Sequence, residues 1–161
     1  MKKIYFLAKL FEGLGGGLIR QAQVKYLSNA GYEVTVITPN YRSNELVIKD
    51  NIVYIPFSRK IKIYNLMEHL GLKDDYIDNW VKKAYKYLRD EIDSSDILFA
   101  TCGGELGPIK LASLLKNKNG SLYIANFHDP IKCTYVNGIK INSRFHVDRE
   151  KQEDKYLSDL D

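Results

Sequence analysis

Hydrophobic positions along this chain alternate between short continuous apolar runs and longer segments with helical spacing. Apolar residues recur every three or four positions after Leu18, from Ile77 to Ile92 and after Pro108, which predicts three amphipathic helices. Short runs bounded by polar or turn residues are typical of strands buried in a sheet. These runs are Lys3–Ala8, Glu33–Thr38, Asn51–Ile55, Asp96–Thr101 and Ser121–Phe127.

Strands that alternate with helices of this length imply parallel pairing, right-handed crossovers and helices on both sides of the sheet. The sequence therefore predicts an α/β fold: a Rossmann-like, doubly wound, mainly parallel sheet with helices on both faces. Ligands of such sheets bind at the carboxyl ends of the strands, near the point where strand order reverses. We expect the loops after the first, fourth and fifth strands to share that rim.

Two segments lie outside this regular pattern. A short helix is predicted around Tyr64–Leu70. Cys133–Ile141 has alternating residues around Asn137-Gly138, which is typical of a hairpin turn.

Charge divides the chain into two parts. The formal net charge is +4, but the residues up to Phe145 carry 21 basic and 14 acidic side chains. Arg149–Leu160 is highly charged and predicts an exposed helix. We therefore assign a Rossmann-like domain to 1–145 and a charged helical tail to 146–161, and we expect the chain to stop before the domain is complete. A basic body suits nucleotides or an anionic membrane surface, although its lysines can equally serve solubility alone.

A glycine run follows the first strand directly and precedes the first helix. In Glu12–Arg20 (EGLGGGLIR), Gly15, Gly16 and Gly17 would leave backbone N–H groups free at the positive end of that helix. Such a turn can cradle phosphate or another anion. It can equally be no more than a tight turn.

Standard nucleotide motifs do not fit this run. A dinucleotide-binding loop needs G-x-G-x-x-G, and Leu18 stands where the third glycine belongs. Thr38-Pro39-Asn40 also lacks the acid that would hold a ribose. The phosphate loop G-x-x-x-x-G-K-[ST] is absent, so the sequence argues against NAD binding and against a standard ATPase.

Polar residues follow two later strands. Cys102 begins a second glycine loop, and His128-Asp129 ends the fifth strand. A cysteine with a downstream histidine could act as a nucleophile with its base, but a cysteine at a strand end is more often an apolar filler. His128-Asp129 has two interpretations: a functional pair on the ligand rim, or a turn cap at Asp129 with a structural histidine.

The amino-terminal residues MKKIYFLAKLF resemble a signal peptide, yet Lys9 and Glu12 interrupt the apolar run early, which favours a buried first strand. No apolar run approaches the roughly 20 residues of a membrane span. Two cysteines do not suggest a disulfide framework, so a cytoplasmic location is expected. His69, His128 and His146 show no ligand spacing, and no metal site is predicted.

Together these segments resemble a known family. KIYFLA, GLGGG and a helix leading into NAGYEVTVITPN are similar to the opening of family 4 glycosyltransferases, and DILFAT and YIANFHDP are similar to that family's fourth and fifth strands. The resemblance implies the GT-B architecture, in which two Rossmann-like domains face each other across a cleft. This chain then corresponds to the amino-terminal, acceptor-side half.

The resemblance also implies roles for the three loops. The first glycine loop would approach the donor diphosphate and the acceptor, and the second would contact the acceptor. The fifth strand would supply a histidine near the transferred sugar and an aspartate that supports the rim. The residues concerned are His128 and Asp129 as catalytic residues, and Gly15, Gly16, Gly17, Gly103, Gly104 and Glu105 as binding residues.

The implied reaction transfers a hexose, with retention, from a nucleoside diphosphate sugar to a hydroxyl of a glycan or lipid-linked acceptor. No metal, cofactor or covalent enzyme nucleophile is expected. The second domain, with its paired glutamates, is missing from these 161 residues, so the chain alone is expected to be inactive. Bacterial polysaccharide synthesis at the inner face of the membrane would suit such an enzyme. The alternative is a non-catalytic Rossmann-like module that binds an anionic ligand or a protein; nucleic acid is not an expected partner.

Overall fold

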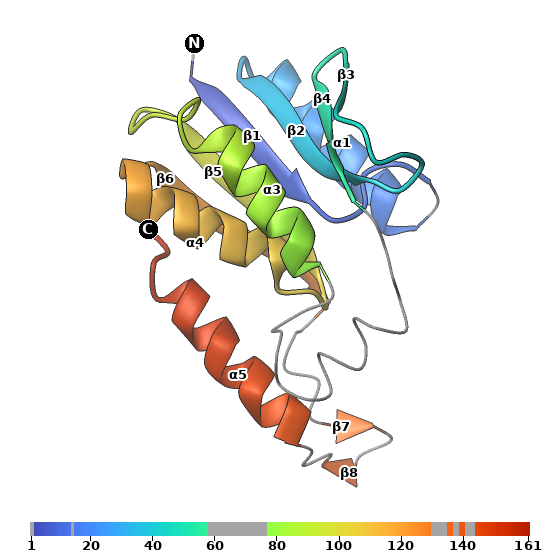
Figure 1. Cartoon of the computed structure of the whole chain (residues 1–161), viewed down its shortest axis with the longest axis vertical. Helices are drawn as coiled ribbons and strands as arrows, with labels where there is room; N and C mark the ends of the chain where they lie inside the picture. Colours follow the sequence, from blue (N-terminus) through green and yellow to red (C-terminus); the bar gives the residue numbers. More distant parts are fainter. Residues whose placement is uncertain (1, 14, 58–76, 130–134, 137–138, 141–143) are drawn as a thin grey trace.

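A computed structural model describes residues 2–13, 15–57, 77–129, 135–136, 139–140 and 144–161 (Figure 1). Within these residues, six strands form the main sheet, in the order β3-β4-β2-β1-β5-β6. Neighbouring strands pair in parallel, except that β3 runs antiparallel to β4. The strands are β1 (Lys3–Ala8), β2 (Glu33–Asn40), β3 (Val47–Lys49), β4 (Ile52–Pro56), β5 (Ile97–Gly103) and β6 (Leu122–Asp129).

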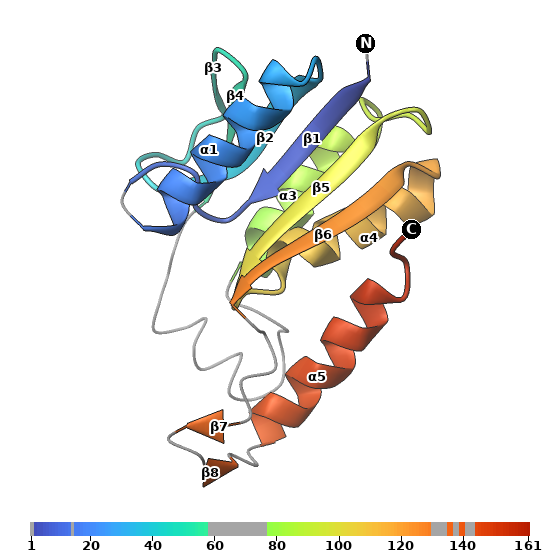
Figure 2. The ribbon, with the colours of Figure 1, turned by 180° about the vertical axis from the view of Figure 1, so that it is seen from behind.

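Helices cover both faces of this sheet, as predicted. Helix α1 (Gly16–Asn29) lies on one face (Figure 2), and α3 (Asp78–Leu88) and α4 (Gly107–Asn119) lie on the other (Figure 1). The core on the α3 and α4 side includes the fully buried Trp80, Leu98 and Tyr123. A smaller core under α1 includes Phe6, whose ring stacks on that of Phe99 with centroids 5.2 Å apart. Among the described helices, none is both long enough and apolar enough to cross a bilayer.

Strand order reverses between β1 and β5. The chain first builds outward from β1 through β2 and β4, then returns to the other side of β1 with β5 and β6. The predicted doubly wound, mainly parallel sheet is therefore confirmed. The loops after β1 and β5 stand on either side of the reversal, where the fold class places ligands.

Two elements differ from the prediction. Strand β3 was not predicted, because its three residues are exposed and belong to a polar connector. Helix α5 (Arg144–Leu157) was predicted as exposed from Arg149 onward, but Tyr156 is only 5% exposed and belongs to the α4 side of the core. The segment is so highly charged that its sequence shows no sign of a buried side.

The predicted hairpin is present as β7 (Tyr135–Val136) and β8 (Ile139–Lys140), which pair antiparallel. Its turn, Asn137-Gly138, lies outside the described residues, as does the predicted short helix at Tyr64–Leu70.

Candidate functional site

The glycine run forms a tight turn that packs closely on itself. Gly15 precedes α1 with φ +69°, a left-handed conformation that glycine adopts without steric cost. A Cβ on Gly17 would lie 3.0 Å from the carbonyl oxygen of Glu12, whereas a Cβ on Gly16 would meet only the guanidinium of Arg20. Turn geometry and close packing thus account for Gly15 and Gly17. The Leu18 N–H donates to the Gly15 carbonyl at 3.0 Å, and the predicted anion contact of the N–H groups at Gly15–Gly17 stays a prediction.

A buried charge cluster joins the loops at the strand-order reversal. Arg20 of α1 is 4% exposed; its Nε donates to Thr101 Oγ1 at 3.1 Å and its Nη1 to the Leu10 carbonyl at 3.0 Å. The Glu105 carboxylate lies 3.7 Å from Arg20 Nη2 and 3.8 Å from Lys9 Nζ. The cluster therefore ties α1 and the loop after β1 to the loop after β5.

Glu105 faces the protein interior. Its exposed fraction is 3%, and burial raises the pKa of its carboxyl, although Lys9 and Arg20 favour the charged form. Its contact with an acceptor stays a prediction; in the structure its carboxylate connects two loops. Arg20 is not among the residues predicted from the sequence, since helical spacing alone does not show which strand a polar helix residue will face.

The carboxyl ends of β5 and β6 lie side by side. A register shift after Cys102 pairs Gly103 with Asp129 across β5 and β6. His128 is half-buried near the same end of β6, and Gly104 has φ +87°. Cys102 is fully buried in the core, which favours the apolar-filler interpretation.

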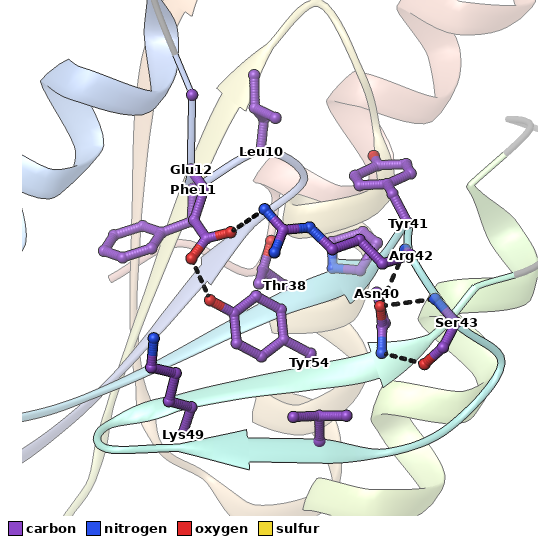
Figure 3. Close-up of a pocket in the computed structure, with 13 residues that line it drawn as sticks. Leu10, Phe11, Glu12, Thr38, Asn40, Tyr41, Arg42, Ser43, Lys49 and Tyr54 are labelled. Carbon is purple, nitrogen blue, oxygen red and sulfur yellow. Dashed lines mark hydrogen bonds and ion pairs between the residues drawn. The ribbon is translucent and has the colours of Figure 1, made fainter.

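A pocket of about 410 Å³ opens on the β2 and β4 side of β1 (Figure 3). The loop after β1 forms one wall, the end of β2 and its turn form a second, and β3 and β4 form the third. This pocket was not predicted from the sequence. Its lining is Leu10, Phe11, Glu12, Gly13, Thr38, Pro39, Asn40, Tyr41, Arg42, Ser43, Val47, Lys49 and Tyr54.

Glu12 is the central polar group of this pocket (Figure 3). Its Oε1 accepts a hydrogen bond from the Tyr54 hydroxyl at 2.6 Å, and its Oε2 lies 3.5 Å from Arg42 Nη2. Burial, together with the bond to Glu12, raises the pKa of Tyr54 to about 12, so its hydroxyl is protonated and donates at neutral pH. The Arg42 side chain is 89% exposed, which makes its ion pair weak. Tyr54 therefore orients the carboxylate, and Arg42 remains able to move.

Asn40 builds the wall that carries Arg42. The Asn40 side-chain oxygen accepts from the backbone N–H groups of Arg42 and Ser43, both at 3.0 Å, and its amide donates to the Glu45 carbonyl at 2.9 Å. This is the local bonding pattern that lets Asn replace a backbone turn. It directs the chain leaving β2 across the mouth of the pocket, and the Tyr41 hydroxyl adds a bond to the Lys9 carbonyl at 3.1 Å.

Helix α1 holds the opposite wall. Arg20 donates to the Leu10 carbonyl, and Gln21 Nε2 donates to the Phe11 carbonyl at 2.9 Å. The contact of Gly17 with the backbone of Glu12 completes this attachment. The glycine run is therefore connected to the pocket through the residues that come before it.

The pocket residues had only faint signals in the sequence. Glu12 stands inside the glycine run, and Pro39-Asn40 marks a turn after the second strand. Tyr54 reads as an ordinary strand residue, because nothing in a linear pattern places it opposite Glu12, 42 positions earlier.

Comparison of the chain with protein-family models, with curated proteins and with solved structures finds no match. The part of the chain that the structure describes contains no group of three or more His, Cys, Asp or Glu side chains able to hold a metal ion.

Proposed function

We propose that this chain is the acceptor-side domain of a retaining glycosyltransferase. The observation that carries the proposal is the coincidence, at the carboxyl edge of one doubly wound sheet, of the glycine loop and a pocket that the same loop lines. The order of the motifs that resemble family 4 glycosyltransferases supports it. The reaction is transfer of a hexose from a nucleoside diphosphate sugar to a hydroxyl of a glycan or lipid-linked acceptor.

The chemistry needs stabilisation of a departing diphosphate and of an oxocarbenium-like sugar. In this proposal the N–H groups at Gly15–Gly17 face the diphosphate, where preorganised donors act on developing charge. His128 and Asp129 stand at the end of β6 near the transferred sugar, and Gly103 and Gly104 contact the acceptor. A second domain supplies most of the nucleotide-sugar site, so this domain alone transfers nothing.

A second candidate is a non-catalytic module that binds an anionic ligand. The basic character of the residues up to Phe145 and the predicted anion contact at the start of α1 favour it. The two candidates differ in what they bind: the first takes glycans and nucleotide sugars, and the second takes nucleotides or other anions.

A thermal-shift experiment with the purified chain separates them. Its melting temperature is measured with nucleoside diphosphates, nucleoside diphosphate hexoses and neutral oligosaccharides, each in excess. The proposed function predicts stabilisation by at least one oligosaccharide, since a ligand that binds the folded state raises its stability by mass action. Stabilisation by nucleotides, but by no glycan or nucleotide sugar, would refute it in favour of the anion-binding module.

A further inference from the structure

The pocket beside Glu12 combines hydrogen-bond acceptors and donors on one wall. The Glu12 carboxylate has about four lone-pair positions, and its contacts with Tyr54 and Arg42 use part of them. Arg42 brings donors to the same wall. Such a wall suits groups that both donate and accept, and hydroxyl groups have this property.

The charged groups around the pocket balance one another, so the pocket as a whole does not attract an anion. Glu12 lies in the wall, and Asp50 is close enough for its charge to help raise the pKa of Tyr54. Arg42 and Lys49 balance these two acids. A phosphate or carboxylate that approached Arg42 would have to displace or face the Glu12 carboxylate.

The remaining surface is apolar and aromatic. Leu10, Phe11 and Val47 line the pocket together with the rings of Tyr41 and Tyr54 (Figure 3). Tyr41 is held in place, because its ring packs edge-on against Phe57 with centroids 5.4 Å apart. A volume of about 410 Å³ lies within the range of small-molecule sites. Such surfaces pack against the C–H faces of a ring.

We propose that this pocket binds one hexopyranose ring of an uncharged saccharide. The Glu12 carboxylate accepts hydrogen bonds from ring hydroxyls, Arg42 donates to a ring or hydroxyl oxygen, and Tyr54 acts as a positioning residue that fixes the carboxylate. The role of this sugar as the acceptor rests on the proposed function. The binding itself does not.

The test is an NMR titration of the isotope-labelled chain with three probes, the neutral methyl glycosides of glucose, galactose and mannose, at millimolar concentration. Amide shifts are expected in the loop after β1 and in the turn after β2, for at least one probe. Glu12→Gln should weaken that binding about tenfold, since a hydrogen bond to a charged group is worth more than one to a neutral group. Tyr54→Phe should weaken it less, by freeing the carboxylate.

Glu91→Gln is the matched control, because Glu91 is exposed and precedes the amino-terminal end of β5, whereas the pocket lies at the carboxyl ends of the strands. It should leave binding unchanged, and the amide spectra of all variants establish that they are folded. Glucuronate and glucose 6-phosphate should bind more weakly than methyl glucoside. The proposal is overturned if all three neutral glycosides fail to bind, if their shifts map elsewhere, if Glu12→Gln binds as well as the parent, or if the anionic sugars bind more tightly.

The outcomes for the pocket and for the proposed function differ. Neutral sugar shifts at the end of β5 and β6, with none near Glu12, would remove the pocket and leave the glycosyltransferase proposal standing. The reverse case is specific sugar binding at Glu12 while the full gene product transfers no sugar from any nucleoside diphosphate hexose. That result would keep the pocket proposal and remove the glycosyltransferase proposal.

Discussion

Gly17 of α1 packs directly against the backbone of Phe11 and Glu12. A Cβ on Gly17 would lie 3.0 Å from the carbonyl oxygen of Glu12 and 3.2 Å from that of Phe11, so this backbone would have to move by a few tenths of an ångström to admit it. A Cβ on Gly16, its neighbour, would lie 3.2 Å from Arg20 Nη1, a side-chain atom rather than backbone. The two adjacent glycines therefore differ in what a side chain would meet: backbone at Gly17 and a side chain at Gly16.

Gly17→Ala should lower the free energy of unfolding by about 1–3 kcal/mol, because the new methyl group must displace the backbone of the preceding loop. Gly16→Ala should change it by less than about 1 kcal/mol, the range of helix propensity alone. Urea unfolding of both variants measures the difference. Equal effects would contradict the close-packing explanation.

Glu105 should leave a signature in the pH dependence of stability. Its pKa is raised in the folded protein above the ordinary 4.5, so the folded state binds more protons than the unfolded state as pH rises past that value. Stability associated with this carboxyl is present below pH 4.5 and is lost as pH rises through the folded pKa.

The unfolding free energy of the parent minus that of Glu105→Gln should therefore decrease as pH increases from 4.5. Urea unfolding of both proteins at a series of pH values measures this difference. The contributions of the titratable groups that both proteins share cancel in the subtraction. A difference that grows with pH would mean that the ion pairs with Arg20 and Lys9 outweigh burial.

At the scale of elements, α3 and α4 pack through one very close contact. Gly107 begins α4 against Ile77, and a Cβ on Gly107 would overlap the Ile77 Cγ2 atom. Lys110 and Asp78 add an ion pair of 2.9 Å between the same helices. Close approach at one point and a polar link beside it set how these helices cover the sheet.

Gly107→Ala should destabilise the protein by about 1–3 kcal/mol through overpacking. Ile77→Ala should also destabilise it, by leaving a cavity. The double variant should lose less than the sum of the two single losses, because each change relieves the other, and coupling of this kind is expected of residues in contact. Chemical denaturation of the four proteins gives the coupling energy; simple additivity would disprove the contact.

At the scale of the whole molecule, α5 and the last residues close the fold onto α4 and β6. Asp159 accepts from Ser113 at 2.5 Å and from Asn117 at 2.9 Å, and Asp161 accepts from the backbone N–H of Tyr123 at 2.9 Å. Tyr156 joins the core on that side. The charged tail is packed on the domain rather than projecting from it.

Tyr156→Ala should cost about 3–5 kcal/mol, as truncation of a buried aromatic does. Tyr26→Ala is the control, since Tyr26 is 75% exposed, and should cost less than about 0.5 kcal/mol. Thermal or urea unfolding compares them. If the two variants are equally stable, α5 is not part of the folded unit.

The sequence by itself determined the class of fold and the edge at which its loops meet. Burial on both faces of a parallel strand produces a continuous apolar run, and an amphipathic helix repeats every three or four residues, so both kinds of element are visible in one dimension. β1 was predicted with its observed bounds, and each of the other predicted strands agrees within two residues at each end. Exposed β3 and the buried side of α5 were missed, because neither has that periodic pattern.

Only the tertiary structure decided how the candidate site is assembled. Glu12 meets Tyr54, and Arg20 meets Thr101 and Glu105, because the crossovers of a doubly wound sheet bring distant loops to one edge. Side-chain contacts of this range depend on strand order, register and helix rotation, and composition and spacing encode none of these locally. The glycine run marks this edge of the sheet in the sequence, but the contact of Gly17 with the backbone of Glu12 exists only in the folded chain.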